Sequence, residues 1–296
     1  MNQSPIAFIG LGQMGAPMAL NLLKAGFSVC GYDRDITIAK RFCDAPSFTW
    51  GATAADTVLN ASMAVLMLPD SSIVDALLWE GDQPISKMMA PGSLLIDMSS
   101  SDPMHSRHNA QKLKSIGIGF IDAPVSGGVK KAEAGTLAIM MGGETALIDK
   151  ARPVLSAMGT TLTYVGNEGS GHAVKALNNY VSAAGLLAVS EALCAAVKFG
   201  VDPHVVNQVF NASTAKNNTT ENKVEAYMLS STYNSGFALS LMKKDLETAN
   251  RFMEQVNASS NFSAKCLEIW QSGDHFLGKG ADHTAMYEFI KKRNIG

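Results

Sequence analysis

The sequence predicts an α/β fold in which a doubly wound parallel sheet is followed by an all-α domain built around a long central helix. Over the first 165 residues, short apolar segments alternate with helix-length segments. Beyond residue 165 only helical patterns follow. We therefore expect two domains, formed by residues 1–165 and 166–296.

The expected strands of the first domain are apolar on both faces. Such strands are typical of a parallel sheet that helices cover on both sides, and right-handed crossovers then give a doubly wound sheet. The segments concerned are IAFIG (6–10), FSVCGYD (27–33), MAVLMLP (63–69), SLLIDMSS (93–100), IGFIDAPVS (118–126) and TLAIMMGG (136–143).

The second domain is expected to begin with one long helix over residues 172–199. This segment contains no proline and one internal glycine, and Gly200 can end it. At about 1.5 Å per residue the helix would be roughly 40 Å long. Small and apolar residues recur on nearly every face, so we expect it to be buried on most sides. Asp202 and Pro203 are typical of the start of a following helix.

Composition excludes several classes of protein. The net charge is -2, so no basic field favours nucleic acid or an anionic membrane. No CxxC pair occurs among the four cysteines, and the six histidines lack metal-binding spacing, so we expect no metal site. The N-terminal segment has no basic region before its apolar run, and we expect no signal peptide and a cytoplasmic protein.

A glycine-rich turn follows the first expected strand, in FIGLGQMGAPMALNLL (8–23). Gly10 permits a tight turn, Gly12 lets the backbone approach a pyrophosphate, and Gly15 allows close packing of helix and strand. The helix start offers unpaired N–H groups and partial positive charge. The pattern predicts a Rossmann-type dinucleotide site formed by Gly10, Leu11, Gly12, Gln13, Met14 and Gly15.

The choice between NAD and NADP depends on two adjacent residues. Asp33 ends the second expected strand, 23 residues after Gly10, where a carboxylate can accept hydrogen bonds from ribose hydroxyls. A carboxylate there repels a 2′-phosphate and favours NAD. Arg34 could instead stack on adenine or pair with that phosphate, so NADP stays open.

Four motifs in order resemble the β-hydroxyacid dehydrogenase family, which contains 3-hydroxyisobutyrate dehydrogenase and tartronate semialdehyde reductase. They are the glycine-rich segment, DAPVSGG (122–128), GSGHAVKALNN (169–179) and FALSLMKKDL (237–246). The resemblance covers essentially the whole chain. It implies an NAD(P)-dependent enzyme that transfers a hydride between the nicotinamide and a small hydroxy acid, at a site between a Rossmann-type and a helical domain.

The same resemblance implies roles for individual residues. Lys175 matches the catalytic lysine and Asn179 a substrate-binding asparagine, while Ser126, Gly127 and Gly128 match the positions that hold the substrate carboxylate. The positions expected to lie near the cofactor are Leu68, Pro69, Ser100, Phe237 and Lys244. One block departs from the family: NASTAKNN (211–218), with Ala215 and Lys216, stands where many relatives carry glycine and arginine, which puts the substrate in doubt.

The residues themselves support this chemistry. Ser126 and the two glycines after it follow a strand, where open α/β sheets bind ligands, and they would form a neutral cradle for a small carboxylate. Lys175 and Asn179 are four residues apart, so they share one helix face. We expect Lys175 in the first turn of the helix, where apolar surroundings and the positive helix end would lower its pKa toward the working range.

Other functions remain open at this point. A non-catalytic NAD(P) sensor or scaffold could use the same fold, although it would not need a proton carrier. Decarboxylation of a phosphosugar would need a cationic cluster that the helical half lacks, and imine reductases typically lack the lysine. We expect Asp245 to act as an ion-pair partner or cap, and the long apolar helix favours a homodimer or homotetramer.

Overall fold

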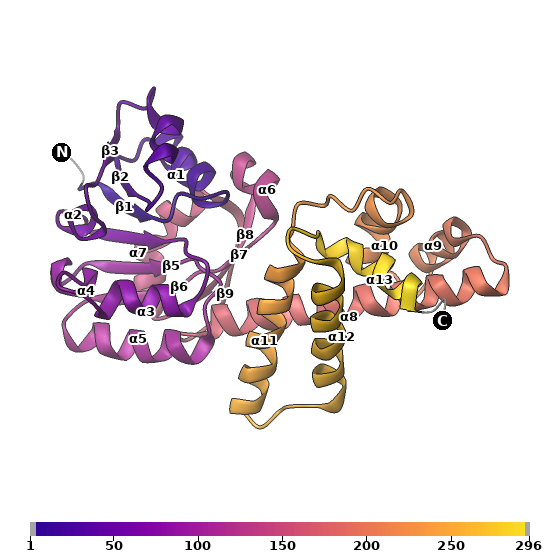
Figure 1. The fold of residues 1–296 in the computed structure, drawn as a ribbon. Helices are drawn as coiled ribbons and strands as arrows, with labels where there is room; N and C mark the ends of the chain where they lie inside the picture. Colours follow the sequence, from indigo (N-terminus) through magenta and orange to yellow (C-terminus); the bar gives the residue numbers. More distant parts are fainter. Residues whose placement is uncertain (1–3, 294–296) are drawn as a thin grey trace. The chain divides into compact units, whose positions relative to one another are not determined.

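The computed structural model describes residues 4–293 (Figure 1). Contacts divide the chain into two compact units, Met1–Lys175 and Ala176–Gly296, which are described separately. The division falls within helix α8 (Ser170–Phe199). The boundary expected at residue 165 stays a prediction.

The first unit contains a largely parallel sheet, as predicted. Its order is β3-β2-β1-β4-β5-β6-β8-β7, with β9 paired to β8. The strands are β1 (Ile6–Ile9), β2 (Val29–Tyr32), β3 (Phe48–Trp50), β4 (Met63–Leu66), β5 (Leu94–Asp97), β6 (Gly119–Asp122), β7 (Val125–Ser126), β8 (Leu137–Gly142) and β9 (Gly159–Gly166).

The sheet differs from the expectation at its two edges. Strand β8 is antiparallel to β6 and β7, whereas β9 is parallel to β8. Two strands, β3 and β9, were not expected. The first has three residues and the second is largely exposed, so neither carries the continuous apolar pattern of a central strand.

Helices cover both faces of this sheet and form two apolar cores. One core packs α1, α6 and α7 against residues such as Phe8 and Ile96, and the other packs α2 to α5 against the alternate residues Ala7, Ile9 and Leu95. The helices are α1 (Gly15–Lys24), α2 (Ala54–Val58), α3 (Ser71–Trp79), α4 (Ile85–Met88), α5 (Pro103–Ser115), α6 (Gly128–Ala134) and α7 (Thr145–Ser156), with a 3₁₀ segment η1 (Ile36–Phe42).

The second unit is all-helical, which confirms the predicted fold class. Its core surrounds the fully buried Trp270 and includes Leu186 and Leu193 of α8. Asp202 caps the following helix by accepting from the His204 N–H, as the sequence predicts. The elements are α9 (Pro203–Ala212), α10 (Asn218–Asn222), the π-helical η2 (Val224–Leu229), α11 (Leu239–Gln255), α12 (Asn261–Leu277), the 3₁₀ segment η3 (His283–Ala285) and α13 (Met286–Arg293).

Helix α8 is less buried within the chain than its composition predicts. Val181 and Phe199 are 66% and 88% exposed, because no neighbouring element of the chain covers them. Among the described helices, α8 is the one whose length and hydropathy would permit a membrane span, and 39% of its apolar window is buried. Residues of this helix form part of the core around Trp270, so those two properties alone do not define a membrane segment.

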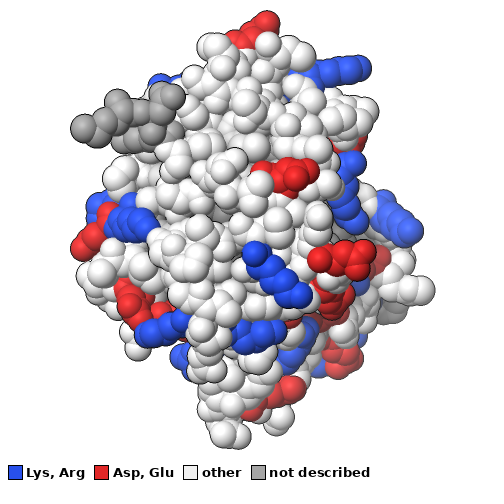
Figure 2. Space-filling model, turned by 90° about the vertical axis from the view of Figure 1, so that its left-hand side faces the viewer, with Lys and Arg blue, Asp and Glu red and all other residues white. Residues whose placement is uncertain are grey.

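Charged side chains of both signs are interspersed on the face seen in Figure 2. This arrangement matches the near-neutral net charge of -2. No large field of one sign covers that face.

Candidate active site

The glycine-rich turn joins β1 to α1 and has the geometry of a phosphate-binding loop. A Cβ at Gly10 would overlap the carbonyl oxygen of Met67, and one at Gly15 would overlap that of Gly10. Glycine is therefore required at both positions for close packing. A Cβ at Gly12 would meet nothing within 4 Å, so open space borders the backbone where a pyrophosphate would approach.

The start of α1 fits an anionic group. Its N-cap residue, Met14, makes no side-chain capping bond, and no acidic residue lies in the first turn. The N–H groups at this end are thus not capped by a side chain, and the helix dipole adds partial positive charge. The loop and helix start fit the pyrophosphate of a dinucleotide.

Asp33 lies beside this loop and has a structural role as well. Its Oδ2 accepts the Leu11 N–H at 2.7 Å, and its Oδ1 accepts the Asp35 N–H at 3.0 Å. The carboxylate therefore fixes the glycine loop against the end of β2. Each carboxylate oxygen keeps a further lone pair for a ribose hydroxyl. Arg34 is exposed beside it.

The segments after β4 and β5 meet at the same edge of the sheet. The Ser99 hydroxyl accepts the Leu68 N–H at 2.9 Å, which joins the two segments that contain Pro69 and Ser100. Leu68 and Ser100 are partly exposed and Pro69 is exposed. These residues follow parallel strands, where the crevice of an open α/β sheet lies.

The expected carboxylate cradle lies at the end of β7 and the start of α6. Gly127 and Gly128 have φ angles of 138° and 68°, a region that favours glycine, and both are exposed. Ser126 is partly exposed on β7. The aliphatic stem of Lys131 lies close to Gly127, whereas a Cβ at Gly128 would meet nothing within 4 Å. The neutral cradle for a carboxylate stays a prediction.

A buried polar network, which the sequence analysis missed, holds the first turn of α8. Oδ1 of Asp122 accepts the Gly169 N–H at 2.7 Å, and its Oδ2 accepts the His172 N–H at 2.8 Å. Burial raises the pKa of Asp122, while the His172 side chain and these two N–H groups lower it part of the way. Asp122 thus caps the start of α8 through N–H groups that lie 47 and 50 residues later in the chain.

The His172 ring completes this network. Its Nδ1 lies 2.7 Å from the Ser106 hydroxyl and its Nε2 3.0 Å from the Ser99 carbonyl oxygen. A carbonyl oxygen only accepts, so Nε2 carries a proton. Asp122 and Asp97 lie 3.7 and 4.0 Å from the ring nitrogens. The sequence contains one feature that could have indicated this network: the buried strands β5 and β6 each end in an aspartate, Asp97 and Asp122.

Lys175 lies in the second turn of α8, which corrects the expectation of the first turn. The helix begins at Ser170 because the bonds from Asp122 order the residues before His172. Lys175 is partly buried. The lowering of its pKa stays a prediction.

Asn179 is buried and is joined to Lys244 through one carboxylate. Its amide donates to Asp245 Oδ2 at 2.5 Å, and the Lys244 ammonium lies 3.2 Å from Asp245 Oδ1. Asp245 is therefore an ion-pair partner, one of the two roles the sequence predicted for it. It also orients Asn179, which sequence reasoning did not anticipate.

Phe237 lies in another part of the second unit. Its ring packs edge-on against His283 at 5.6 Å between centroids. Its N–H donates to Asp282, whose carboxylate also accepts the Ser235 hydroxyl and the Gly236 N–H. The structure fixes Phe237 just before α11, the helix that carries Lys244.

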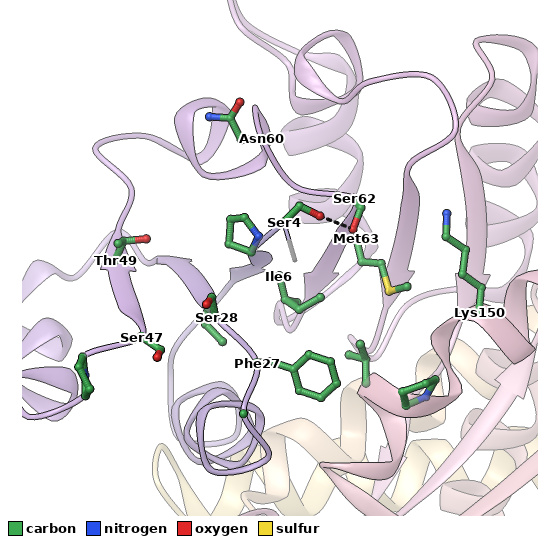
Figure 3. Close-up of a pocket in the computed structure, with 16 residues that line it drawn as sticks. Ser4, Ile6, Phe27, Ser28, Ser47, Thr49, Asn60, Ser62, Met63 and Lys150 are labelled. Carbon is green, nitrogen blue, oxygen red and sulfur yellow. Dashed lines mark hydrogen bonds between the residues drawn. The ribbon is translucent and has the colours of Figure 1, made fainter. Parts of the chain in front are cut away.

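One pocket lies at the opposite edge of the sheet, at the amino ends of the strands. It has a volume of about 1020 Å³ and is lined at the amino ends of β1, β2 and β4 by residues such as Ile6, Val29 and Met63 (Figure 3). Two of its lining residues, Ser4 and Ser62, are hydrogen-bonded to each other at 2.7 Å (Figure 3). Ligands of open α/β sheets bind at the carboxyl ends of strands, so this pocket is not the expected site.

The described residues contain no group of three or more His, Cys, Asp or Glu side chains that could hold a metal ion. Cys30, Cys43, Cys194 and Cys266 are all free thiols.

Comparisons with known proteins define the class of protein. Residues 5–166 match the family model described as the NAD binding domain of 6-phosphogluconate dehydrogenase. Residues 169–290 match the model described as NAD-binding of NADP-dependent 3-hydroxyisobutyrate dehydrogenase. The protein is thus an NAD(P)-dependent oxidoreductase.

Individual relatives narrow the class to a family. The chain is 34% identical to 2-(hydroxymethyl)glutarate dehydrogenase of Eubacterium barkeri, over 90% of this chain and 88% of that one. It is 36% identical to human mitochondrial 3-hydroxyisobutyrate dehydrogenase, over 98% and 88%. The solved structure of Mycobacterium tuberculosis 3-hydroxyisobutyrate dehydrogenase with L-serine is 30% identical, with a TM-score of 0.90 over 98% and 99% of the two chains. The chain belongs to the β-hydroxyacid dehydrogenase family.

Proposed function

We propose that this enzyme oxidises a small hydroxy acid of the 3-hydroxyisobutyrate type, or reduces the corresponding semialdehyde, with Lys175 as general acid and base. The position of Lys175 carries the proposal: it follows the clamped first turn of α8 and shares a helix face with the buried Asn179. Relatives that act on hydroxy acids support the substrate class.

The proposed roles follow from the chemistry of each group. Ser126, Gly127 and Gly128 bind the substrate carboxylate through a hydroxyl and backbone N–H groups. The neutral amine of Lys175 takes the proton of the substrate hydroxyl, and in the reverse direction its ammonium returns a proton to the carbonyl oxygen. Asn179, oriented by Asp245, hydrogen-bonds the substrate. Bound nicotinamide would supply the hydride acceptor at C4.

We propose NAD as the preferred cofactor. The loop Gly10–Gly15 and the start of α1 would hold its pyrophosphate, and Asp33 its ribose. The Asp33 carboxylate is tied to the Leu11 N–H, so its negative charge stays next to the loop and would repel a 2′-phosphate. Leu68, Pro69, Ser100, Phe237 and Lys244 are proposed to complete the cofactor side.

The remaining proposals concern the context of the enzyme. The exposed Val181 and Phe199 of α8 support a homodimer or homotetramer, because apolar side chains of this size favour burial. Four free thiols and balanced charge support a cytoplasmic protein that binds neither nucleic acid nor membrane. Residues 1–165 would bind the cofactor, and residues 166–296 would serve substrate binding and assembly.

A spectrophotometric screen tests the function. Purified protein is incubated with hydroxy acids of three to six carbons and either NAD or NADP, and the absorbance of the reduced nicotinamide is followed. We expect turnover of 3-hydroxy acids and a higher kcat/KM with NAD. Tight NAD binding without turnover of any hydroxy acid would favour the non-catalytic sensor instead.

A further inference from the structure

Lys223 is a largely buried lysine of the second unit whose ammonium has a hydroxyl, and no carboxylate of the described residues, as its close partner. It lies between α10 and η2, and its ammonium donates to the Ser182 hydroxyl of α8 at 3.4 Å. None of the ion pairs formed by residues 4–293 includes it. By contrast, the ammonium groups of Lys216, Lys243 and Lys244 lie 2.8, 2.7 and 3.2 Å from carboxylates.

The surroundings of Lys223 disfavour its charge. Burial lowers the pKa of Lys223 to about 8, although attraction to Asp282 raises it in part. A partly buried cation without an ion pair costs free energy of folding. Titratable groups perturbed by burial are candidates for functional sites, and this ammonium is therefore a candidate for binding an anionic group.

The partner of Lys223 identifies the site to which this ammonium belongs. Lys175, Asn179 and Ser182 are at positions i, i+4 and i+7 of α8, so they form one stripe on the helix. Ser182 lies about 4.5 Å along the helix axis from Asn179 and about 10 Å from Lys175. The Lys223 ammonium therefore lies beside the face of α8 that carries Ser182 and Asn179.

The backbone around Lys223 is held firmly in place. Asn217 and Thr220 form a reciprocal capping box at the start of α10. The carbonyl of Lys223 accepts the N–H groups of both Tyr227 and Met228, which begins the π-helical segment η2. Single π-helical turns occur often at functional sites. Helix α10 and then η2 follow the NASTAKNN block (211–218), the segment that the sequence analysis expects to differ from the family.

We propose that Lys223 is a specificity-determining residue that binds a second carboxylate of the substrate, remote from the reacting alcohol. The preferred substrate is then a dicarboxylic hydroxy acid. This proposal rests on the proposed function of Lys175 and Asn179. A monocarboxylic acid leaves the ammonium unpaired, whereas a second carboxylate provides a charge-assisted hydrogen bond.

Two substrates that differ only at the remote end test the proposal. In 2-(hydroxymethyl)glutarate a carboxyethyl arm replaces the methyl group of 3-hydroxyisobutyrate. For the full-length wild type we expect a higher kcat/KM with the dicarboxylate. In Lys223→Met, kcat/KM for the dicarboxylate divided by kcat/KM for 3-hydroxyisobutyrate should fall about 10- to 100-fold. This is the change expected from the loss of one hydrogen bond to a charged group. Lys223→Arg should restore part of the ratio.

A matched control and a binding assay separate the possible failures. Lys265→Met removes an exposed lysine paired with Glu268 at 2.7 Å and should leave the ratio unchanged. Calorimetric titration with glutarate, compared with butyrate, should show weaker glutarate binding to Lys223→Met alone. If the wild type oxidises 3-hydroxyisobutyrate but Lys223→Met leaves the ratio intact, the proposal for Lys223 is wrong. If the wild type oxidises neither acid, the proposed function fails, and the titration still decides whether Lys223 binds a carboxylate.

Discussion

Removing the Asp122 carboxylate should loosen the start of α8. This side chain is fully buried and accepts two backbone N–H bonds, at 2.7 and 2.8 Å. Asp122→Ala leaves both N–H groups without an acceptor, at a cost of about 1–3 kcal/mol each. The variant also avoids burying a carboxylate, which offsets part of this loss. We expect the free energy of unfolding to fall by about 2–3 kcal/mol.

Calorimetry and hydrogen exchange measure this effect. For a protein of this size, a loss of about 1 kcal/mol in the free energy of unfolding lowers the Tm by about 2–4 °C. The Tm of Asp122→Ala should therefore fall by about 5–10 °C. Amide exchange in a peptide covering residues 167–175 should accelerate more than exchange elsewhere in the first unit. Asp122→Asn keeps one acceptor oxygen and should lose less stability.

An exposed aspartate serves as the control. Asp149 forms a surface ion pair with Arg152 at 3.4 Å, and Asp149→Ala should change stability by less than about 1 kcal/mol. If Asp122→Ala exchanges normally at residues 167–175 and melts within about 2 °C of the wild type, the capping role of Asp122 is refuted.

Three further predictions concern the cofactor, the proton carrier and pH. Gly12→Val fills open space beside the loop, so the Kd for NAD, measured by fluorescence titration, should rise at least about 10-fold with little change in Tm; unchanged affinity would contradict the site. Lys175→Ala should lower kcat by about a hundredfold to ten-thousandfold while NAD still binds, and a near-normal kcat would reject its role. The lowered pKa of Lys223 means that the folded protein binds fewer protons than the unfolded chain between pH 8 and 10.5, so this group makes stability rise with pH there. Replacing this ammonium, in Lys223→Met, should raise the free energy of unfolding, measured in urea, above that of the wild type. This difference should shrink as the pH rises from 8 to 10.5, and a constant difference would exclude a buried ammonium.

The sequence alone predicted features that depend on neighbours in the chain. The turn from β1 to α1 follows from Gly10 and Gly15, which admit no Cβ. The cap formed by Asp202 and the long helix α8 also follow from local patterns. The family resemblance added the candidate roles of Lys175 and Asn179, which no local pattern could distinguish from those of other helical residues.

Tertiary structure decided the contacts between residues distant in the chain. Asp122 caps α8 across 47 and 50 residues, and Lys223 reaches Ser182 across 41. The edge strands and the antiparallel β8 likewise depend on pairing with distant segments. Periodicity reports which face of an element is buried, whereas the partner that satisfies a buried polar group is set by the packing of the whole chain.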